Sequence, residues 1–480
     1  MILILAITLP IVTGALLPAM RLNTAARNLY MMVSTLLTSV LVAVALMSNA
    51  AQFDMISLTN KLTISLRLDD LGKVFSAVIA LLWPITLLYA LNYMKDAVNQ
   101  TSFFTFFQMS YGVTLGIAMS ANLLTLYIFY ELMTLSTLPL VLHGGSAKSV
   151  KAGLKYLYYS LGGSAFAFIG LVYLVYFGSG TDFLPGGLFA GVGSQHTTQL
   201  QLGYLLCFFG FGVKAAIFPL HGWLPTAAVA PTPVTALLHA VAVVKSGVFA
   251  IIRVTYFSFG ISVLAGSYAQ YIPLALSAFT IVFGSAMALK ERHLKRRLAY
   301  STVSNLSYIL FGALLMSAQG LYSALMHLVF HALMKITLFL AVGVFNRRAH
   351  AYYVEDVRGI AKALPVLAVV FVIGSLSMTS IPPLIGFVSK WSLAGAAVLS
   401  GGLLPHVGVG ALLVSAVLTG MYLMVPAVTM YTQPLAIPAP QRVEPGFYVA
   451  LVVLSAMILA LSFYSGPLLD FLHRTALGAI

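Results

Sequence analysis

The sequence predicts an all-α polytopic membrane protein with about fourteen transmembrane helices. Hydrophobic residues make up 60% of its 480 residues and charged residues only 8%, whereas soluble domains are about 25% charged. Apolar stretches of about 20 residues, long enough to cross a bilayer core, recur along the whole chain. This composition excludes a water-soluble enzyme.

The apolar stretches place the predicted spans in order along the chain. They lie near residues 2–20, 29–48, 71–93, 103–120, 122–142, 154–177, 202–220, 232–256, 270–289, 299–317, 320–345, 364–396, 407–431 and 446–465. The first stretch lacks a basic segment and a small-residue cleavage site, so we expect a retained helix and not a signal peptide. Residues 62–68 alternate between apolar and polar side chains, which predicts a short hairpin outside the membrane.

Lys and Arg residues gather in alternate loops and give the predicted orientation. With the N-terminus outside, the loops between spans 1–2, 3–4, 5–6, 9–10, 11–12 and 13–14 face the cytoplasm and hold most of the 25 basic residues. This agrees with the excess of positive charge in cytoplasmic loops. The net charge of +14 therefore follows membrane topology, and no nucleic acid partner is expected. The expected location is an energy-transducing membrane, the inner membrane of a prokaryote.

Cofactor and metal sites are not expected in this chain. Cys207 is its single cysteine and lies in an apolar stretch, which excludes a disulfide framework, a thiolate metal site and an iron–sulfur cluster. The His, Asp and Glu residues show no spacing typical of a metal site. A redox centre would therefore belong to another subunit.

Four lysines and one glutamate fall well inside the predicted spans: Lys214, Lys245, Lys335, Lys390 and Glu131. A charge at the bilayer centre costs about 2.5–3.5 kcal/mol on insertion scales, so such residues face the protein interior or water. A structural ion pair or a side chain reaching the interface explains a single case. One glutamate cannot neutralise four lysines, and burial disfavours the charged form of an amine. The five charged residues together favour a proton relay.

The eleventh span adds histidines to this set. His327, His331 and Lys335 are spaced at i, i+4 and i+8 and share one helix face. A lone histidine in an apolar helix is usually a core residue, but three protonatable groups in a stripe favour proton transfer through bound water. His239, six residues before Lys245, need not share its face.

Prolines interrupt the seventh and twelfth spans, at Pro219 and at Pro382-Pro383. His221, beside the first break, is an accessory candidate, as is His239. Proline breaks helical hydrogen bonding, and broken helices near midplane charges are typical of transporters built from inverted repeats. The two spans are five apart, which predicts two inverted five-helix repeats with broken helices 7 and 12. The expected parts are residues 1–102 (helices 1–3 with the hairpin), 103–256 (first repeat), 257–431 (second repeat) and 432–480 (helix 14).

Several segments around these residues resemble one known family. They are Gly212 to Ala227 (GVKAAIFPLHGWLPTA), Ala230 to Ala240 (APTPVTALLHA), Val244 to Gly247 (VKSG), Tyr130 to Met133 (YELM), Leu298 to Ser304 (LAYSTVS), His327 to Lys335 and Ile381 to Lys390 (IPPLIGFVSK). The chain is similar to the antiporter-like, proton-translocating membrane subunits of respiratory complex I, Mrp-type Na⁺/H⁺ antiporters, membrane-bound hydrogenases and formate hydrogenlyases. Tyr130 stands where many members have tryptophan.

The resemblance implies a role for each matching residue. It implies a switching ion pair between Glu131 and Lys214, and a terminal group at Lys390. The central relay would be formed by Lys245 with His331 and Lys335 of the eleventh span.

The predicted function is proton movement along this axis, driven by a redox or antiport partner subunit. The chain is then not catalytic alone, and its partners are H⁺ and other membrane subunits within the lipid bilayer. A Na⁺/H⁺ antiport subunit is the alternative. A stand-alone secondary transporter and a structural membrane anchor are further rivals.

Overall fold

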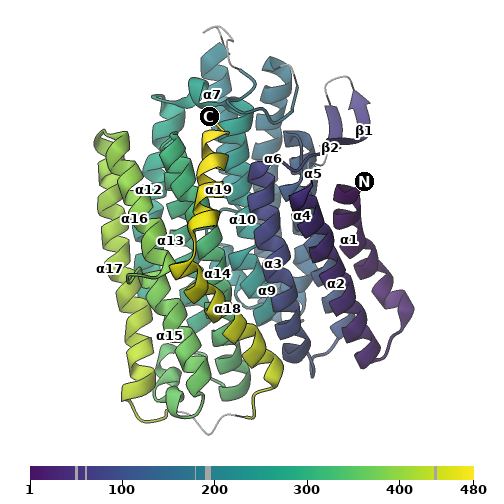
Figure 1. Ribbon diagram of the computed structural model, residues 1–480, viewed down its shortest axis with the longest axis vertical. Coiled ribbons are helices and arrows are strands. Elements are labelled where there is room, and N and C mark those ends of the chain that lie inside the picture. The colour runs from purple at the N-terminus through teal and green to yellow at the C-terminus, as the bar shows by residue number, and fades with distance from the viewer. Residues whose placement is uncertain (49–51, 60–61, 179, 190–195, 437–440) are drawn as a thin grey trace.

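The structure is a computed structural model that describes residues 1–48, 52–59, 62–178, 180–189, 196–436 and 441–480. Its long helices run side by side as one bundle (Figure 1). They are α1 (Ile2–Met20), α2 (Thr24–Met47), α3 (Asp70–Tyr93), α4 (Gln100–Ala118), α5 (Leu123–Leu142), α6 (Ala147–Phe177), α12 (Tyr268–Lys290), α13 (Leu294–Leu314), α14 (Ala318–Ala349), α17 (Leu403–Thr432) and α18 (Pro445–Phe463). The prediction of a mostly helical, polytopic protein is confirmed.

Shorter helices accompany the long ones. They are α7 (Thr197–Gly212), α8 (Leu224–Ala227), α9 (Thr232–Ala240), α10 (Val243–Arg253), the π-helical segment Val254–Phe259, α11 (Ile261–Leu264), α15 (Pro365–Thr379), α16 (Ile385–Ser400) and α19 (Gly466–Leu477), with 3₁₀ turns at Val354–Val357 and Ile360–Lys362. Among the described residues, ten helical stretches are long and apolar enough to cross a membrane, and α15 and α16 are shorter apolar helices.

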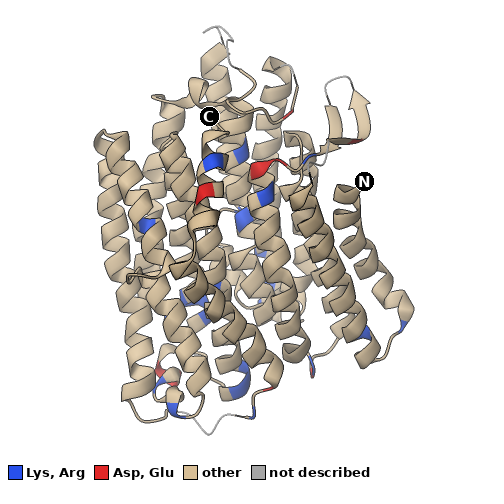
Figure 2. Ribbon diagram, in the orientation of Figure 1, with Lys and Arg blue, Asp and Glu red and all other residues tan. Residues whose placement is uncertain are grey.

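A two-stranded hairpin stands at the end of the bundle near the N-terminus (Figure 1). Strand β1 (Phe53–Thr59) pairs antiparallel with β2 (Leu62–Leu66), with Phe53 opposite Leu66. The predicted hairpin is therefore confirmed. Lys and Arg residues mark several loops at the opposite end of the bundle, and others lie within it (Figure 2).

Polar residues just before several helices fix where those helices begin. The side chains of Asn23, Asp69, Asn122 and Ser317 each accept a hydrogen bond from a backbone N–H in the first turn of α2, α3, α5 and α14. Such N-caps satisfy donors that have no partner within the helix. The capped helices therefore start at defined levels, which sets the height of the side chains that they carry.

Two chain segments interrupt the helices where the sequence predicts spans seven and twelve. Helix α7 ends at Gly212 and helical structure resumes with α8 at Leu224. The predicted span 364–396 contains α15 and α16, separated by residues 380–384. Because proline lacks an N–H, each interruption leaves helix-end carbonyls available to side chains.

The most buried helical stretches form the centre of the bundle. Residues Thr232–Phe259 and helix α14 are 100% and 94% buried over their most apolar part, compared with 33% for α1 and α18. These central stretches carry Lys245 and the residues from His327 to Lys335. Lys245, His327, His331 and Lys335 therefore lie in the core of the protein and not on its outer face.

Helix α19 follows α18 and was not predicted. Its twelve residues include Asp470 and Arg474, which lower the hydropathy below that of a span. The helix packs on α14, where His473 meets the ring of Tyr322 with centroids 5.3 Å apart. The chain thus ends with a short helix along the bundle (Figure 1).

Candidate functional site

Lys245 and His331 meet in the centre of the bundle. The Lys245 Nζ and the His331 Nδ1 are 2.8 Å apart, and both side chains are fully buried. Lys245 comes from α10 and His331 from α14. A lysine amine and an imidazole nitrogen at this distance can exchange a proton directly, because each can donate or accept.

The stripe on α14 continues from His331 to His327, as its helical spacing predicts. The two imidazole rings stack with centroids 5.8 Å apart. His327 Nδ1 lies 3.0 Å from Ser389 Oγ, and His327 Nε2 lies 3.2 Å from Asn305 Oδ1. His327 is therefore held on both sides by polar groups from α16 and α13.

Lys390 lies beyond His327, in the second turn of α16, and its side chain reaches back to the end of α15. Its Nζ donates a 2.7 Å hydrogen bond to the carbonyl of Met378, in the last turn of α15. Helix C-terminal carbonyls carry partial negative charge and have no partner within the helix. Lys390 also lies 5.2 Å from the ring centroid of Tyr308, whose ring is 5.3 Å from that of His327. The interruption therefore creates the acceptor that holds this buried amine.

Lys335 forms a branch of the same cluster. Its Nζ donates to the Leu298 carbonyl at 3.0 Å and to Ser301 Oγ at 2.6 Å, both on α13. Ser301 Oγ in turn accepts a hydrogen bond from the Tyr422 hydroxyl at 2.8 Å. The predicted residues Lys245, His331 and Lys335 are thus placed in one buried region.

Lys214 approaches this region just after α7 ends. Its Nζ donates to the backbone carbonyl of Tyr130 and lies 3.4 Å from the centroid of the Tyr130 ring. Gly247 of α10 packs directly on this segment, since a Cβ there would lie 2.8 Å from the Lys214 carbonyl carbon. Glycine thereby lets α10, which carries Lys245, approach the Lys214 backbone closely.

The implied ion pair between Glu131 and Lys214 is not formed in this structure. It is absent from the ion pairs within 4.0 Å among the described residues, and the half-buried Glu131 has one carboxyl oxygen without a hydrogen-bond partner. The Tyr130 carbonyl, one residue away, receives the amine instead. A backbone acceptor that close satisfies the buried amine without the carboxylate.

The other predicted residues, His239, His221 and the prolines, lie outside this cluster of lysines and histidines. His239 is fully buried, stacks on Phe339 with ring centroids 4.7 Å apart, and has no hydrogen-bond partner among the described residues at either ring nitrogen. His221 packs against Phe283 at 4.8 Å, beside the exposed Pro219. Cis peptide bonds precede Pro219 and Pro383, and the latter follows Pro382 in the break before Lys390.

Lys295 is a buried amine that sequence reasoning placed in a loop. It lies in the first turn of α13 and donates a 2.8 Å hydrogen bond to the Ala230 carbonyl, between α8 and α9. Leu298, whose carbonyl holds Lys335, follows one turn later on the same helix. Because its acceptor is a backbone carbonyl of a segment 65 residues away, the sequence carries no signal of this contact.

Arg253 was also missed, although it falls within a predicted span. Its guanidinium is fully buried and donates to both oxygens of Asp69, at 2.5 and 2.6 Å. Burial opposes the charged form of Asp69, but Arg253 and the Gly72 N–H hold the pKa of this carboxyl below its usual value. The pair joins the start of α3 to the end of α10.

The described part of the chain contains no cluster of side chains that could bind a metal ion. There, no three His, Cys, Asp or Glu side chains lie together as metal ligands would. The arrangement instead offers amines, imidazoles and hydroxyls, which hold and pass protons.

Comparison with known proteins supplies independent findings. Residues 120–419 match the family model described as NADH:quinone oxidoreductase/Mrp antiporter, TM. NADH-quinone oxidoreductase subunit N of Desulforudis audaxviator is 33% identical over 75% of this chain and 71% of its own length. Hydrogenase-4 component B of Escherichia coli is 32% identical over 68% of this chain, and the match spans only half of that relative's length.

A solved structure shows the same fold over nearly the whole chain. It is described as the membrane-bound sulfane sulfur reductase, an archaeal respiratory membrane complex, and one of its chains has a TM-score of 0.89. The alignment covers 99% of this chain and 97% of the other at 22% sequence identity. At that identity the likeness concerns the fold alone.

Proposed function

Because this chain belongs to the NADH:quinone oxidoreductase/Mrp antiporter membrane family, we propose that it carries protons within a multisubunit energy-converting complex. The observation that supports this most directly is the buried series Lys245, His331, His327, Tyr308 and Lys390. Each neighbour in it is in hydrogen-bond or ring contact. Lys335 lies one helical turn from His331 on α14, and Lys214 lies just after α7, where its backbone packs on α10. We call these seven residues the row.

The proposed path enters the row from the end of the bundle that carries the basic loops. Lys295, near that end of α13, lies one helical turn from the carbonyl that holds Lys335. From Lys335 and Lys245 a proton would pass through His331 and His327 toward Lys390. Water would bridge the steps where ring contacts replace hydrogen bonds. Lys390 would then release the proton on the opposite side.

Coupling to a partner subunit would act through Lys214. Moving one charge against 100 mV costs about 2.3 kcal/mol. A hydrogen bond to a charged group contributes about 1.5–3 kcal/mol, which is a comparable amount. If the Lys214 amine moved from the Tyr130 carbonyl to the Glu131 carboxylate, the change in interaction free energy would therefore be large enough to control proton transfer along the row. The driving reaction belongs to a redox or antiport partner.

The proposal extends to topology. Segments α7–α8 and α15–α16 would be two interrupted spans at equivalent places in two inverted five-helix repeats, within residues 103–256 and 257–431. With the other long helices this gives about fourteen spans. The basic loops would face the cytoplasm and the N-terminus the outside of a prokaryotic inner membrane.

Protons fit the row better than Na⁺. Hard cations bind oxygen ligands, whereas the row holds amines and imidazoles. Glu131 is the one acidic residue inside the predicted spans. The alternative is a Na⁺/H⁺ antiport subunit. An assay without sodium distinguishes the two, because only the antiport subunit would require Na⁺.

The test uses the whole complex reconstituted in liposomes, with a dye that reports internal pH. His331→Ala removes the link between Lys245 and His327, and we expect proton translocation per partner turnover to fall by about 100-fold, the usual size of an acid–base contribution. His406→Ala changes an exposed histidine on α17 and should have no effect. Wild-type pumping by His331→Ala would refute the row, and activity that requires Na⁺ would favour the alternative.

A further inference from the structure

A basic cavity lies apart from the row, at the start of α6. Its volume is about 1390 Å³. Its lining comes from α6 and the residues just before it, α8 and the residues just after it, the turn before α13, the first turn of α13, and the segment after α14. Four cations line it, Lys148, Lys151, Lys155 and Arg296, and no Asp or Glu side chain does.

Three of these cations have no ion-pair partner among the described residues. Arg296 is paired with Glu291 at 3.2 Å, outside the lining. Lys155 donates a 3.3 Å hydrogen bond to Thr226 Oγ1, which leaves its charge uncompensated. Lys148 and Lys151 are in no ion pair of the described part. Unpaired charge gathered around one cavity predicts an anionic occupant.

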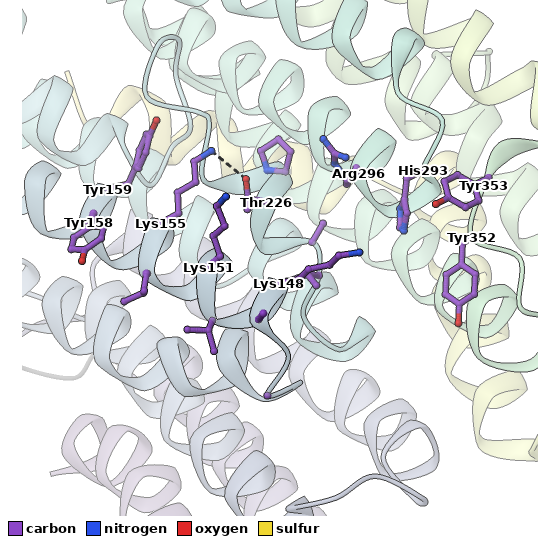
Figure 3. A pocket seen from close by; sticks show the side chains of 17 residues that line it. Lys148, Lys151, Lys155, Tyr158, Tyr159, Thr226, His293, Arg296, Tyr352 and Tyr353 are labelled. Atoms are coloured by element: carbon purple, nitrogen blue, oxygen red, sulfur yellow. Dashed lines mark hydrogen bonds between the residues drawn. The ribbon is translucent and has the colours of Figure 1, made fainter.

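The three lysines stand on one side of α6 at i, i+3 and i+7, a separation of about 10 Å along the helix. Figure 3 shows Lys148 extended toward the side where His293 and Arg296 lie, while Lys151 and Lys155 point toward Thr226. Four tyrosines complete the lining: Tyr158, Tyr159, Tyr352 and Tyr353. Tyrosine hydroxyls donate hydrogen bonds to phosphate, and tyrosines are enriched at membrane–water interfaces.

The cavity continues into an exposed apolar stripe on α6. Leu154 and Tyr158 of the lining are 44% and 68% exposed, and Leu161, Phe168 and Val172 follow on the same side, each nearly half exposed. Their spacing keeps them on one helix face. A molecule with a charged head in the cavity would therefore have an apolar track for its tails. Free phosphate or a polar metabolite would leave that track uncovered.

We propose that this cavity binds the headgroup of an anionic phospholipid, with its acyl chains along the outer face of α6. Basic pockets between transmembrane helices on the cytoplasmic side suit such headgroups. The site does not depend on proton transport and would anchor the lipid whether or not the row conducts.

The test measures lipid binding to the full-length chain by native mass spectrometry in detergent. Phosphatidylglycerol and phosphatidylcholine with identical tails are titrated separately, and inorganic phosphate is added as a competitor. The variant Lys148→Gln/Lys151→Gln/Lys155→Gln removes the unpaired charges. The control, Lys95→Gln/Lys290→Gln/Lys362→Gln, removes three exposed charges that lie at or just after helix ends at the same end of the bundle.

We expect phosphatidylglycerol to bind more tightly than phosphatidylcholine. The cavity variant should weaken phosphatidylglycerol binding by about 100-fold, at about tenfold or less per lysine, and the control variant should leave it unchanged. Equal weakening in both variants, equal affinity for the two lipids, or full displacement by inorganic phosphate would overturn the proposal. If the triple variant fails to fold, the three single variants carry the same comparison.

A competing occupant is an acidic segment of a partner subunit. The same titration with the assembled complex separates the two. Retained phosphatidylglycerol binding supports the lipid, and loss of binding on assembly, with a partner segment cross-linked to Lys151, overturns it.

Discussion

Replacing Asp69 should destabilise the protein far more than replacing its neighbour Asp70. Asp69 accepts two hydrogen bonds from Arg253, which is fully buried, and one from the Gly72 N–H. Asp70 pairs only with Lys73, and its side chain is 56% exposed. Both acids lie at the start of α3, so their comparison isolates the buried pair.

The expected magnitude follows from these contacts. Removing one partner of a buried ion pair costs about 3–5 kcal/mol, and Asp69 is partly exposed, so the lower end applies. Asp69→Ala also removes an N-cap, about 1 kcal/mol, which gives a loss of about 4 kcal/mol. Asp69→Asn keeps the cap and should cost about 2–3 kcal/mol. Asp70→Ala should cost about 0.5 kcal/mol or less, as exposed pairs do.

The assay is unfolding of the purified chain in mixed micelles, monitored by far-ultraviolet circular dichroism. Since the pKa of Asp69 is lowered in the folded state, its stabilisation is present above the unfolded pKa of about 3.9 and is lost as pH falls through the lower folded value. The gap between wild type and Asp69→Asn should be constant from about pH 5 to 8 and narrow below about pH 4.

A double-mutant cycle completes this test. In an Arg253→Met background, Asp69→Asn should cost no more than about 0.5 kcal/mol, because the partner is gone. Additive losses, or equal losses for Asp69→Asn and Asp70→Asn, would refute the interpretation that the pair holds α3 to α10.

Three further predictions concern the row. Gly247→Ala places a Cβ 2.4 Å from the neighbouring backbone and should destabilise by about 1–3 kcal/mol, whereas Gly162→Ala on α6, with open space around it, should be neutral or stabilising in the same micelle assay. Lys390→Met should abolish proton translocation while the partner's redox or antiport turnover persists. Loss of both proton translocation and partner turnover would show that Lys390 has a structural role. Lys295→Met should slow proton uptake from the basic side by at least tenfold and the exposed Lys290→Met should not; equal rates would exclude Lys295 from the path.

The positions of the key residues could be predicted from the sequence because charge inside an apolar span is conspicuous. The spacing of His327, His331 and Lys335 on α14 gave their common face, and the stacked rings confirm it. The hairpin followed from alternation alone. These features depend on residues near one another in the chain.

The partners of those residues could not be predicted in the same way. Lys214 donates to the Tyr130 carbonyl instead of Glu131, and a backbone acceptor leaves no mark in the sequence. Arg253 and Asp69 are 184 residues apart. Lys295 was assigned to a loop because it lies in a charged run, yet α13 begins at Leu294 and carries its amine to a carbonyl.

The partners divide the lysines of the row into two chemical kinds. Lys214 and Lys390 each donate to a backbone carbonyl, which can hold an amine but cannot accept its proton. Lys335 donates to a backbone carbonyl and to the Ser301 hydroxyl, which can relay a proton only by giving up its own. Lys245 instead meets an imidazole nitrogen, which can accept the proton of the amine. The contact between Lys245 and His331 is thus the junction of the row where direct proton transfer is chemically competent without water.

His331→Gln tests this distinction. Glutamine keeps a hydrogen-bonding side chain beside Lys245 but cannot be protonated near neutral pH. We therefore expect proton translocation to fall as far as in His331→Ala, while the unfolding transition in micelles stays close to that of wild type. If His331→Gln translocates protons at the wild-type rate, the imidazole only positions Lys245, and protons pass this point through water.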